Sequence, residues 1–232
     1  MSAQVIASFH LVRYADTSAM RYAAFDRPVL RRTPGLLFWR ILGTGRGPSM
    51  TLGADLRRWA LLAVWRSERH LEAFLRSSPI PARWRREARE RWQVRLTPLA
   101  SHGRWGGVDP FAPVRPFAPA PSAGPVAVLT RAAIRPTRLV AFYRAVPAVD
   151  DDLRRQAGCL ASVGVGEWPL IRQATFSLWR DAAAVRDFAY RRAAHRRVIG
   201  RVRAERWYSE ELFARFTPYA AEGSWDGNDP LG

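Results

Sequence analysis

The chain has 232 residues, of which 48% are hydrophobic and 25% are charged, a composition typical of a globular protein and not of a disordered one. Its formal charge of +17 comes from 37 basic residues against 20 acidic ones, and every basic residue is an arginine, so anionic partners such as nucleic acid or lipid are expected. The single cysteine, Cys159, excludes an internal disulfide, a thiolate zinc site and an iron–sulfur cluster.

The first half of the chain predicts alternating strands and helices. Residues 1–10 lack the charged and apolar regions of a signal peptide, and no apolar run approaches the ~20 residues of a spanning helix, so a cytoplasmic protein is expected. The expected elements are a strand over 4–12, a helix over 17–31, strands over 36–42 and 58–65, a helix from a cap at Ser67 to Phe74, and a strand over 92–99.

The second half predicts the same order of elements. They are a strand over 126–134, a helix from Pro136, strands over 160–165 and 173–179, a helix capped by Asp181, and a strand over 212–219. This order, β-α-β-β-α-β, is that of the ferredoxin-like unit. The sequence therefore predicts an α+β protein made of two such units.

An internal repeat supports that division. Residues 60–67 are echoed by 174–181, which lie 114 residues further on, and residues 103–110 return as 223–230, which lie 120 further on. We expect a tandem duplication of the ferredoxin-like unit that forms a dimeric α/β-barrel-like arrangement within one chain. The predicted domains are residues 1–110, a Pro/Ala-rich linker over 111–124, and residues 125–232.

Four histidines are candidates for chemistry. His70 and His102 are interpreted as surface residues, and His10, placed opposite Arg131 by the repeat, as a core histidine. His195 has no histidine near its counterpart in the first copy. A lone histidine is usually an exposed polar residue, but it also suffices as the single proximal ligand of a haem iron.

The glycine-rich and acidic segments carry weaker signals. Residues 43–48 follow a strand but do not open a helix, and the chain has no P-loop lysine, so a nucleotide site is not favoured. Gly164 and Gly166 are expected in a turn that lets backbone approach a flat ligand. The run over 150–152 is read as helix capping or solvation and not as a metal site, because adjacent carboxylates point in different directions.

Several blocks resemble the spheroidene monooxygenase family of carotenoid biosynthesis. The resemblance runs over nearly the whole chain, and its most distinctive blocks are in the second copy. These blocks are residues 128–132, 164–169, 173–179, His195 and 207–216, with weaker ones at 38–45 and 59–65.

The resemblance implies a haem-dependent monooxygenase that oxidises C2 of acyclic carotenoids such as spheroidene to a 2-keto group. It implies haem b as cofactor, dioxygen as co-substrate and an external electron donor such as a reduced ferredoxin. His195 is then the iron ligand, and Gly164 and Gly166 lie close to the cofactor.

Roles for five further residues follow from the same resemblance. Arg196 and Arg197 are expected to pair with the haem propionates. Arg131 is expected to stabilise an iron-bound oxygen species, with Thr175 or Ser177 as a hydrogen-bond donor.

The implied partners are an apolar carotenoid, an electron-transfer protein and, since the surface is rich in arginine, the inner membrane as a peripheral contact. The sequence leaves a homo-oligomer open. Two other functions also remain open: a haem enzyme of the same scaffold acting on another small apolar substrate, and an arginine-rich nucleic-acid-binding protein. The last is disfavoured because the arginines are spread through both copies.

Overall fold

The computed structural model describes residues 4–45, 53–114, 123–144, 155–168, 172–191 and 204–232, and singly residues 117, 121, 153 and 202. Helix η3 continues as helix over residues 139–144. The elements, in chain order, are β1 (Ile6–Tyr14), η1 (Thr17–Arg21), α1 (Tyr22–Arg31), β2 (Leu36–Gly45), β3 (Ala54–Trp65), α2 (Glu68–Ser77), α3 (Pro79–Glu87), β4 (Ala88–Gly103), η2 (Ala112–Val114), β5 (Val126–Ile134), η3 (Pro136–Arg138), β6 (Cys159–Trp168), β7 (Arg172–Trp179), α5 (Ala182–Arg191) and β8 (Tyr208–Gly223).

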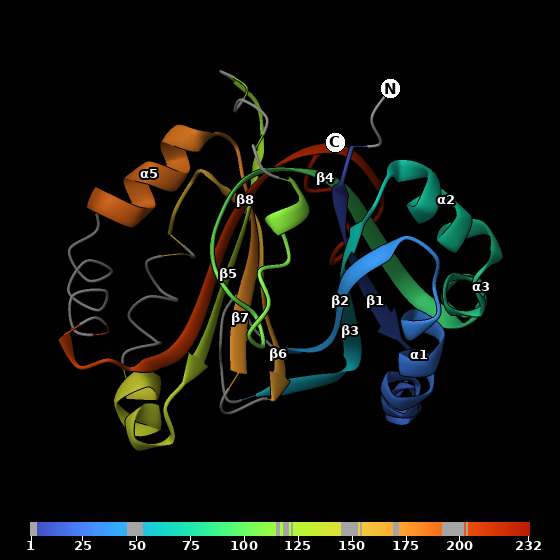
Figure 1. Cartoon of the computed structure of the whole chain (residues 1–232), viewed down its shortest axis with the longest axis horizontal. Coiled ribbons are helices and arrows are strands. Elements are labelled where there is room, and N and C mark those ends of the chain that lie inside the picture. The colour runs from blue at the N-terminus through green and yellow to red at the C-terminus, as the bar shows by residue number, and fades with distance from the viewer. Residues whose placement is uncertain are drawn as a thin grey trace.

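Eight antiparallel strands close into a barrel in the order β1-β3-β2-β6-β7-β5-β8-β4, with helices outside (Figure 1). The predicted α+β class is confirmed. Each half contributes four strands in the same relative order, β4-β1-β3-β2 and β8-β5-β7-β6. The description of each half as a ferredoxin-like unit stays a prediction, as do the domain boundaries. No helix within the described ranges is long and apolar enough to cross a membrane.

Side chains alternate between the barrel interior and the outer face, as the two-residue period of a strand requires. The interior is one apolar core to which both halves contribute. At its centre the rings of Phe9 and Phe176 stack with centroids 4.0 Å apart. The outer face of each half lies under that half's own helices (Figure 1).

The strands β4 and β8 pair with each other over most of their length, from Trp92 opposite Gly223 to Gly103 opposite Leu212. Each carries its half's final turn across to the other half. Glu210 accepts hydrogen bonds from the backbone N–H groups of Gly106 and Gly107, at 2.8 and 2.6 Å. The two halves therefore hold each other's ends.

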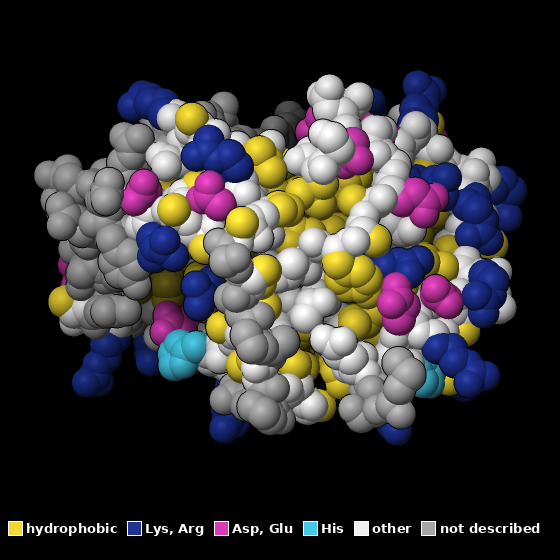
Figure 2. Space-filling view, turned by 90° about the horizontal axis from the view of Figure 1, so that it is seen from above, with side chains coloured by type: hydrophobic (Ala, Val, Ile, Leu, Met, Phe, Trp, Pro, Cys, Tyr) yellow, Lys and Arg dark blue, Asp and Glu magenta, His cyan; other side chains and the backbone are white. Residues whose placement is uncertain are grey.

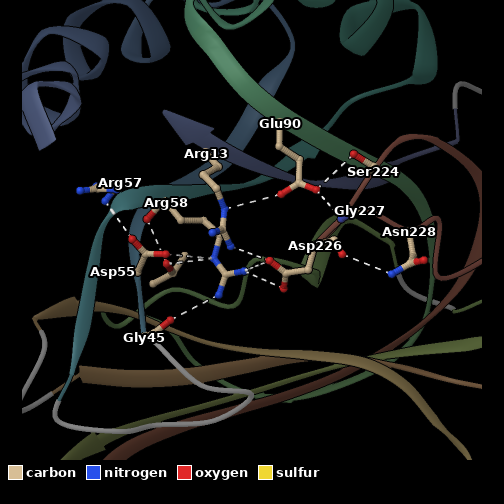
Figure 3. A network of polar contacts seen from close by, with 11 residues as sticks. Arg13, Gly45, Asp55, Arg57, Arg58, Glu90, Ser224, Asp226, Gly227 and Asn228 are labelled. Carbon is tan, nitrogen blue, oxygen red and sulfur yellow. Dashed lines mark hydrogen bonds and ion pairs between the residues drawn. The ribbon is translucent and has the colours of Figure 1, made fainter. Parts of the chain in front are cut away.

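The reciprocal contact at the other end is an ion-pair network (Figure 3). Glu90 accepts a hydrogen bond from the Gly227 N–H at 2.7 Å. Beside it, Arg58 Nη1 donates to both oxygens of Asp226, at 3.2 and 3.1 Å, and Arg13 donates to Oδ1 at 2.5 Å. Arginines of the first half thus bind the final turn of the second.

Two details differ from expectation. Ser67 stands at the N-cap of α2 but makes no capping bond; its hydroxyl is 2.8 Å from His70 Nδ1. Helix α3 was not predicted, because its arginines obscure the apolar spacing of Ile80 and Trp84. By contrast, Asp181 accepts from the Ala184 N–H at 2.7 Å, so the predicted cap of α5 is confirmed.

Candidate functional site

The helix-facing surfaces of the two halves can be compared position by position, because their strand registers match. Ile6 pairs with Trp65 in the first half, and Val126 pairs with Trp179 in the second. Counting along the strands from these pairs places His10 at the position of Thr130. The expectation from the sequence repeat that His10 lies at the position of Arg131 is therefore wrong by one residue.

The first half's surface is filled with side chains. His10 is 2% exposed, its Nε2 lies 2.9 Å from Ser8 Oγ, and its ring packs 5.3 Å from that of Trp84. Trp65 Nε1 donates to the same Ser8 hydroxyl at 2.9 Å. Burial, with a smaller contribution from Arg95, lowers the pKa of His10 to about 3, so the imidazole is neutral at physiological pH. His10 is the core histidine that the sequence predicted.

The second half has small side chains at the corresponding positions. Thr130 takes the place of His10, and it is exposed in the middle of a strand whose other residues are buried. Thr175 pairs with Thr130 and lies opposite Gly164, and Ser177 lies opposite Ser162. In the first half Leu61 takes the position of Thr175, Ile41 that of Gly164, Ala63 that of Ser177 and Trp39 that of Ser162.

We call Thr130, Ser162, Gly164, Gly166, Thr175 and Ser177 the small-residue floor. These residues belong to three neighbouring strands, β5, β7 and β6, and they share the helix-facing side, since the residues that alternate with them pack into the barrel interior. Four of the six are smaller than their first-half counterparts, which are His10, Trp39, Ile41 and Leu61, whereas Gly166 corresponds to Gly43 and Ser177 to Ala63. A flat ligand with polar groups matches such a surface, because glycine permits close approach and hydroxyls supply hydrogen bonds.

Apolar clusters of described residues lie on both sides of the floor. One contains Val128 and Trp179, and the other contains Phe142 and Trp207. In the first half a single continuous cluster covers the corresponding surface. Gln173 Nε2 donates to Tyr143 Oη at 3.0 Å at the edge nearer the second cluster. The floor therefore interrupts a packing layer that is unbroken in the other half.

The structure brings together four of the predicted site residues. Thr175, Gly164 and Gly166 belong to the floor, and so does Ser177, whose hydroxyl accepts from Trp179 Nε1 at 2.9 Å. Ser177 is buried, at 6% exposed, whereas Thr175 is partly exposed, so Thr175 is the more accessible of the two hydroxyls. The glycines were expected in a turn, but they lie within β6.

The predicted ligand segment, His195 with Arg196 and Arg197, lies outside the described residues. The chain that contains it joins α5 to Val202. Helix α5 packs on the second half through Phe188, whose ring is 5.2 Å from that of Trp179. Their roles stay predictions. Within the described ranges no group of three or more His, Cys, Asp or Glu side chains could hold a metal ion.

Arg131 faces the barrel interior, on the opposite side of the sheet from Thr175 and Ser177. It forms an ion pair with Glu210, and its guanidinium lies 5.6 Å from the ring centroid of Trp105. Burial opposes ionisation of Glu210, but the hydrogen bonds from Gly107 and Gly106 and the charge of Arg131 outweigh it and lower the pKa of the carboxyl. The structure therefore does not bring Arg131 together with the other predicted catalytic residues.

A hollow of about 490 Å³ lies beside the network of Figure 3 and is lined in part by Arg13, Arg57 and Arg58. Two of its three arginines, Arg13 and Arg58, are paired with carboxylates. Asp226 binds two of these arginines, and Asp55 accepts from the Arg57 backbone N–H and lies 4.0 Å from Arg58. An anion site is not favoured there.

Sequence reasoning missed Thr130 and Ser162. The signal that identifies them is the difference between the two copies at corresponding outer positions, and reading it requires the strand register. A single-residue error in pairing the first strands moves every comparison to the wrong face of the sheet.

Comparison with known proteins places the chain among carotenoid enzymes. No family model matches it. It is 36% identical over 230 residues to the spheroidene monooxygenase of Rhodobacter capsulatus, covering 97% of this chain and 95% of that protein. It is 39% identical over 207 residues to the spheroidene monooxygenase of Rubrivivax gelatinosus, covering 89% and 78%.

Among solved structures, an aldoxime dehydratase in complex with butyraldoxime has the same fold. The TM-score is 0.63 at 13% identity, over 96% of this chain and 83% of that one. At this identity the likeness concerns the fold alone.

Proposed function

Because the chain belongs to the spheroidene monooxygenase family, we propose that it is a haem-dependent monooxygenase that oxidises C2 of an acyclic, spheroidene-like carotenoid to a 2-keto group. The observation that carries the proposal is the small-residue floor in the second half. It offers hydroxyls and a glycine at positions where the first half has His10, Trp39, Ile41 and Leu61.

The residues of this chain fit a haem b on that floor. Gly164 and Gly166 remove side chains where a macrocycle would lie, and the flanking apolar clusters suit its edges. His195 would be the proximal ligand, and Arg196 and Arg197 would pair with the propionates. When bound, the haem would supply the site for dioxygen, with electrons from an external donor such as a reduced ferredoxin.

Of the two predicted donors, Thr175 is the better placed to donate a hydrogen bond to an oxygen ligand, since it is partly exposed whereas Ser177 is buried. Arg131, on the interior face, is assigned instead to holding Glu210 and the turn at Gly106. We place the catalytic hydrogen bond on the outer side of β7.

The substrate class follows from the names of the relatives, each called a spheroidene monooxygenase. An acyclic carotenoid is long and apolar, so it would reach the enzyme from a lipid phase. The chain would then meet the inner membrane as a peripheral protein.

A haem titration tests the cofactor assignment. The protein should bind one haem and show a Soret band that His195→Ala abolishes or shifts. Thr175→Leu with Gly164→Ile, which restores the residues of the first half, should block binding, whereas Thr175→Val, which keeps the volume and removes the hydroxyl, should retain it. Absence of haem binding by the folded wild-type chain would refute the proposal.

Product analysis tests the substrate. With haem, dioxygen and a ferredoxin–reductase pair, an acyclic carotenoid should give a 2-keto product. The shared fold with an aldoxime dehydratase keeps open a haem enzyme acting on another small apolar substrate. An unchanged carotenoid with intact haem binding would favour that second function.

A further inference from the structure

We infer that one side of the molecule, formed by residues 17–32 and 135–144, is a docking surface for an anionic lipid bilayer. The inference deepens the proposed function, on which it rests for the apolar class of substrate. Both segments lie along the lower side of the molecule in Figure 1, one under each half. We call them together the basic-apolar surface.

The first segment, η1 with α1, presents large apolar side chains to solvent between arginines. Phe25 is 65% exposed and Met20 is 46% exposed. On α1 the spacing of Arg21, Phe25 and Arg32 places all three on one side of the helix. This pattern, an apolar strip flanked by arginines, is typical of helices that lie in a membrane interface.

Arg21 lies near Glu87 and Asp16, but the charge of the segment's other arginines is not neutralised by described carboxylates. Asp26 is the only acidic residue between positions 17 and 54, and it is buried in an ion pair with Arg83 at 2.5 Å. Within the described ranges no carboxylate forms an ion pair with Arg27, Arg31 or Arg32. Arg21, Arg27, Arg31 and Arg32 are all exposed, and of these Arg21 and Arg32 lie on the same side of the helix as Phe25.

The second segment repeats the pattern under the other half. Val140 is 65% exposed, and Arg135 and Arg144 are exposed on either side of it. The segment contains no acidic residue. It also carries Tyr143, which accepts from Gln173 at the edge of the floor, so this part of the surface is in direct contact with the candidate site.

A lipid surface fits these observations better than nucleic acid does. Nucleic-acid binding calls for basic residues gathered on one face with aromatic side chains to stack on bases. Figure 2 shows the opposite face of the molecule, where arginines are spread around the rim, and on the basic-apolar surface itself Phe25 is the one largely exposed aromatic side chain among the described residues. An isolated phenylalanine and an isolated valine, each flanked by arginines, can instead insert below lipid headgroups while the guanidinium groups meet phosphates.

Vesicle co-sedimentation of the full chain tests the surface. The protein should bind vesicles that contain phosphatidylglycerol and bind phosphatidylcholine vesicles far more weakly. Arg31→Gln with Arg32→Gln should weaken binding about thirtyfold, from about 1 kcal/mol per arginine. Phe25→Ser should weaken it about tenfold. The matched control is Arg66→Gln with Arg69→Gln, two exposed arginines around the start of α2. It should change binding much less.

Equal losses in the two double variants would overturn the inference, since binding would then follow total charge. Binding to duplex DNA at physiological salt without binding to vesicles would also overturn it. Haem binding is a separate readout. If the docking variants lose vesicle binding while the wild-type chain binds no haem, the surface stands and the proposed function fails.

Discussion

His10 shows how one residue can close a surface. It occupies the place of Thr130, and its ring packs on Trp84, so the first half has a bulky buried side chain where the second half has an exposed threonine. Burial lowers the pKa of the imidazole in the folded protein relative to the unfolded chain, so the free energy of unfolding should depend on pH.

Stability should depend on pH through His10. The folded pKa is about 3 and the ordinary value is 6.5, so the unfolded chain takes up the proton first as the pH falls. The contribution is fully present above pH 6.5 and is lost between 6.5 and about 3, at about 1.4 kcal/mol per pH unit. Urea unfolding at pH 7 and pH 5 should show a smaller loss for His10→Gln than for the wild type. Parallel pH profiles would contradict this.

Glu210 should matter for stability because it neutralises a buried arginine. The Arg131 side chain is 3% exposed. Glu210→Gln leaves the guanidinium without its ion-pair partner and keeps only one of the two oxygens that accept from the Gly106 and Gly107 N–H groups, and it should lower the free energy of unfolding by about 3 kcal/mol. Glu211→Gln, the exposed neighbour, should change it by less than about 0.5 kcal/mol. Arg131→Met in the Glu210→Gln background should recover part of the loss.

At the scale of elements, the final turn of the second half depends on backbone space. Gly223 has φ +94, and a Cβ there would lie 2.0 Å from the Arg91 carbonyl oxygen, whereas Gly227 has φ +85 with nothing within 4 Å. Gly227→Ala should therefore cost only the left-handed conformation, about 1 kcal/mol, while Gly223→Ala adds a backbone clash and should cost about 3 kcal/mol. Thermal unfolding of the two variants measures the difference. Equal costs would mean that the turn shifts freely.

How far the sequence predicts each element depends on where its partners are. Strand β5 begins and ends as predicted, at Val126 and Ile134, because buried apolar residues occupy both of its ends. Strands β4 and β8 extend well beyond the predicted 92–99 and 212–219. Their C-terminal extensions pair with each other across the two halves, and their N-terminal extensions pair with β1 and β5 of their own halves. Such long-range pairing leaves no local signal.

The candidate site was predictable only in part. The sequence drew attention to Gly164, Gly166, Thr175 and Ser177, which the structure places together. It misplaced Arg131, because a neighbour in sequence on a strand points to the opposite face. Which face of the sheet a residue points to is set by the register of its strand with the partner strand, and apolar spacing alone does not fix it.

At the scale of the whole molecule, the barrel core is shared. Phe9 and Phe176 stack across the two halves, and each half binds the other's final turn through Glu90 and Glu210. Neither half has a complete interior by itself. The sequence repeat therefore does not imply two independent unfolding units.

Unfolding should be a single cooperative transition. Phe9→Ala should lower the free energy of unfolding by about 3–5 kcal/mol and destabilise both halves together, although the substitution lies in the first. Far-ultraviolet circular dichroism, tryptophan fluorescence and amide exchange in α2 and α5 should report the same midpoint. Separate midpoints for the two helices would show that the halves unfold independently.

The contrast between the two outer faces implies a division of labour within one chain. The helix-facing surface of the first half buries large side chains and so contributes to stability. The floor of the second half has smaller and more polar side chains at most of the corresponding positions. Loss-of-function substitutions should then fall into two kinds. Those around His10 should lower the amount of folded protein and be relieved by growth at lower temperature, and those around Thr130 should leave a folded, abundant and inactive protein.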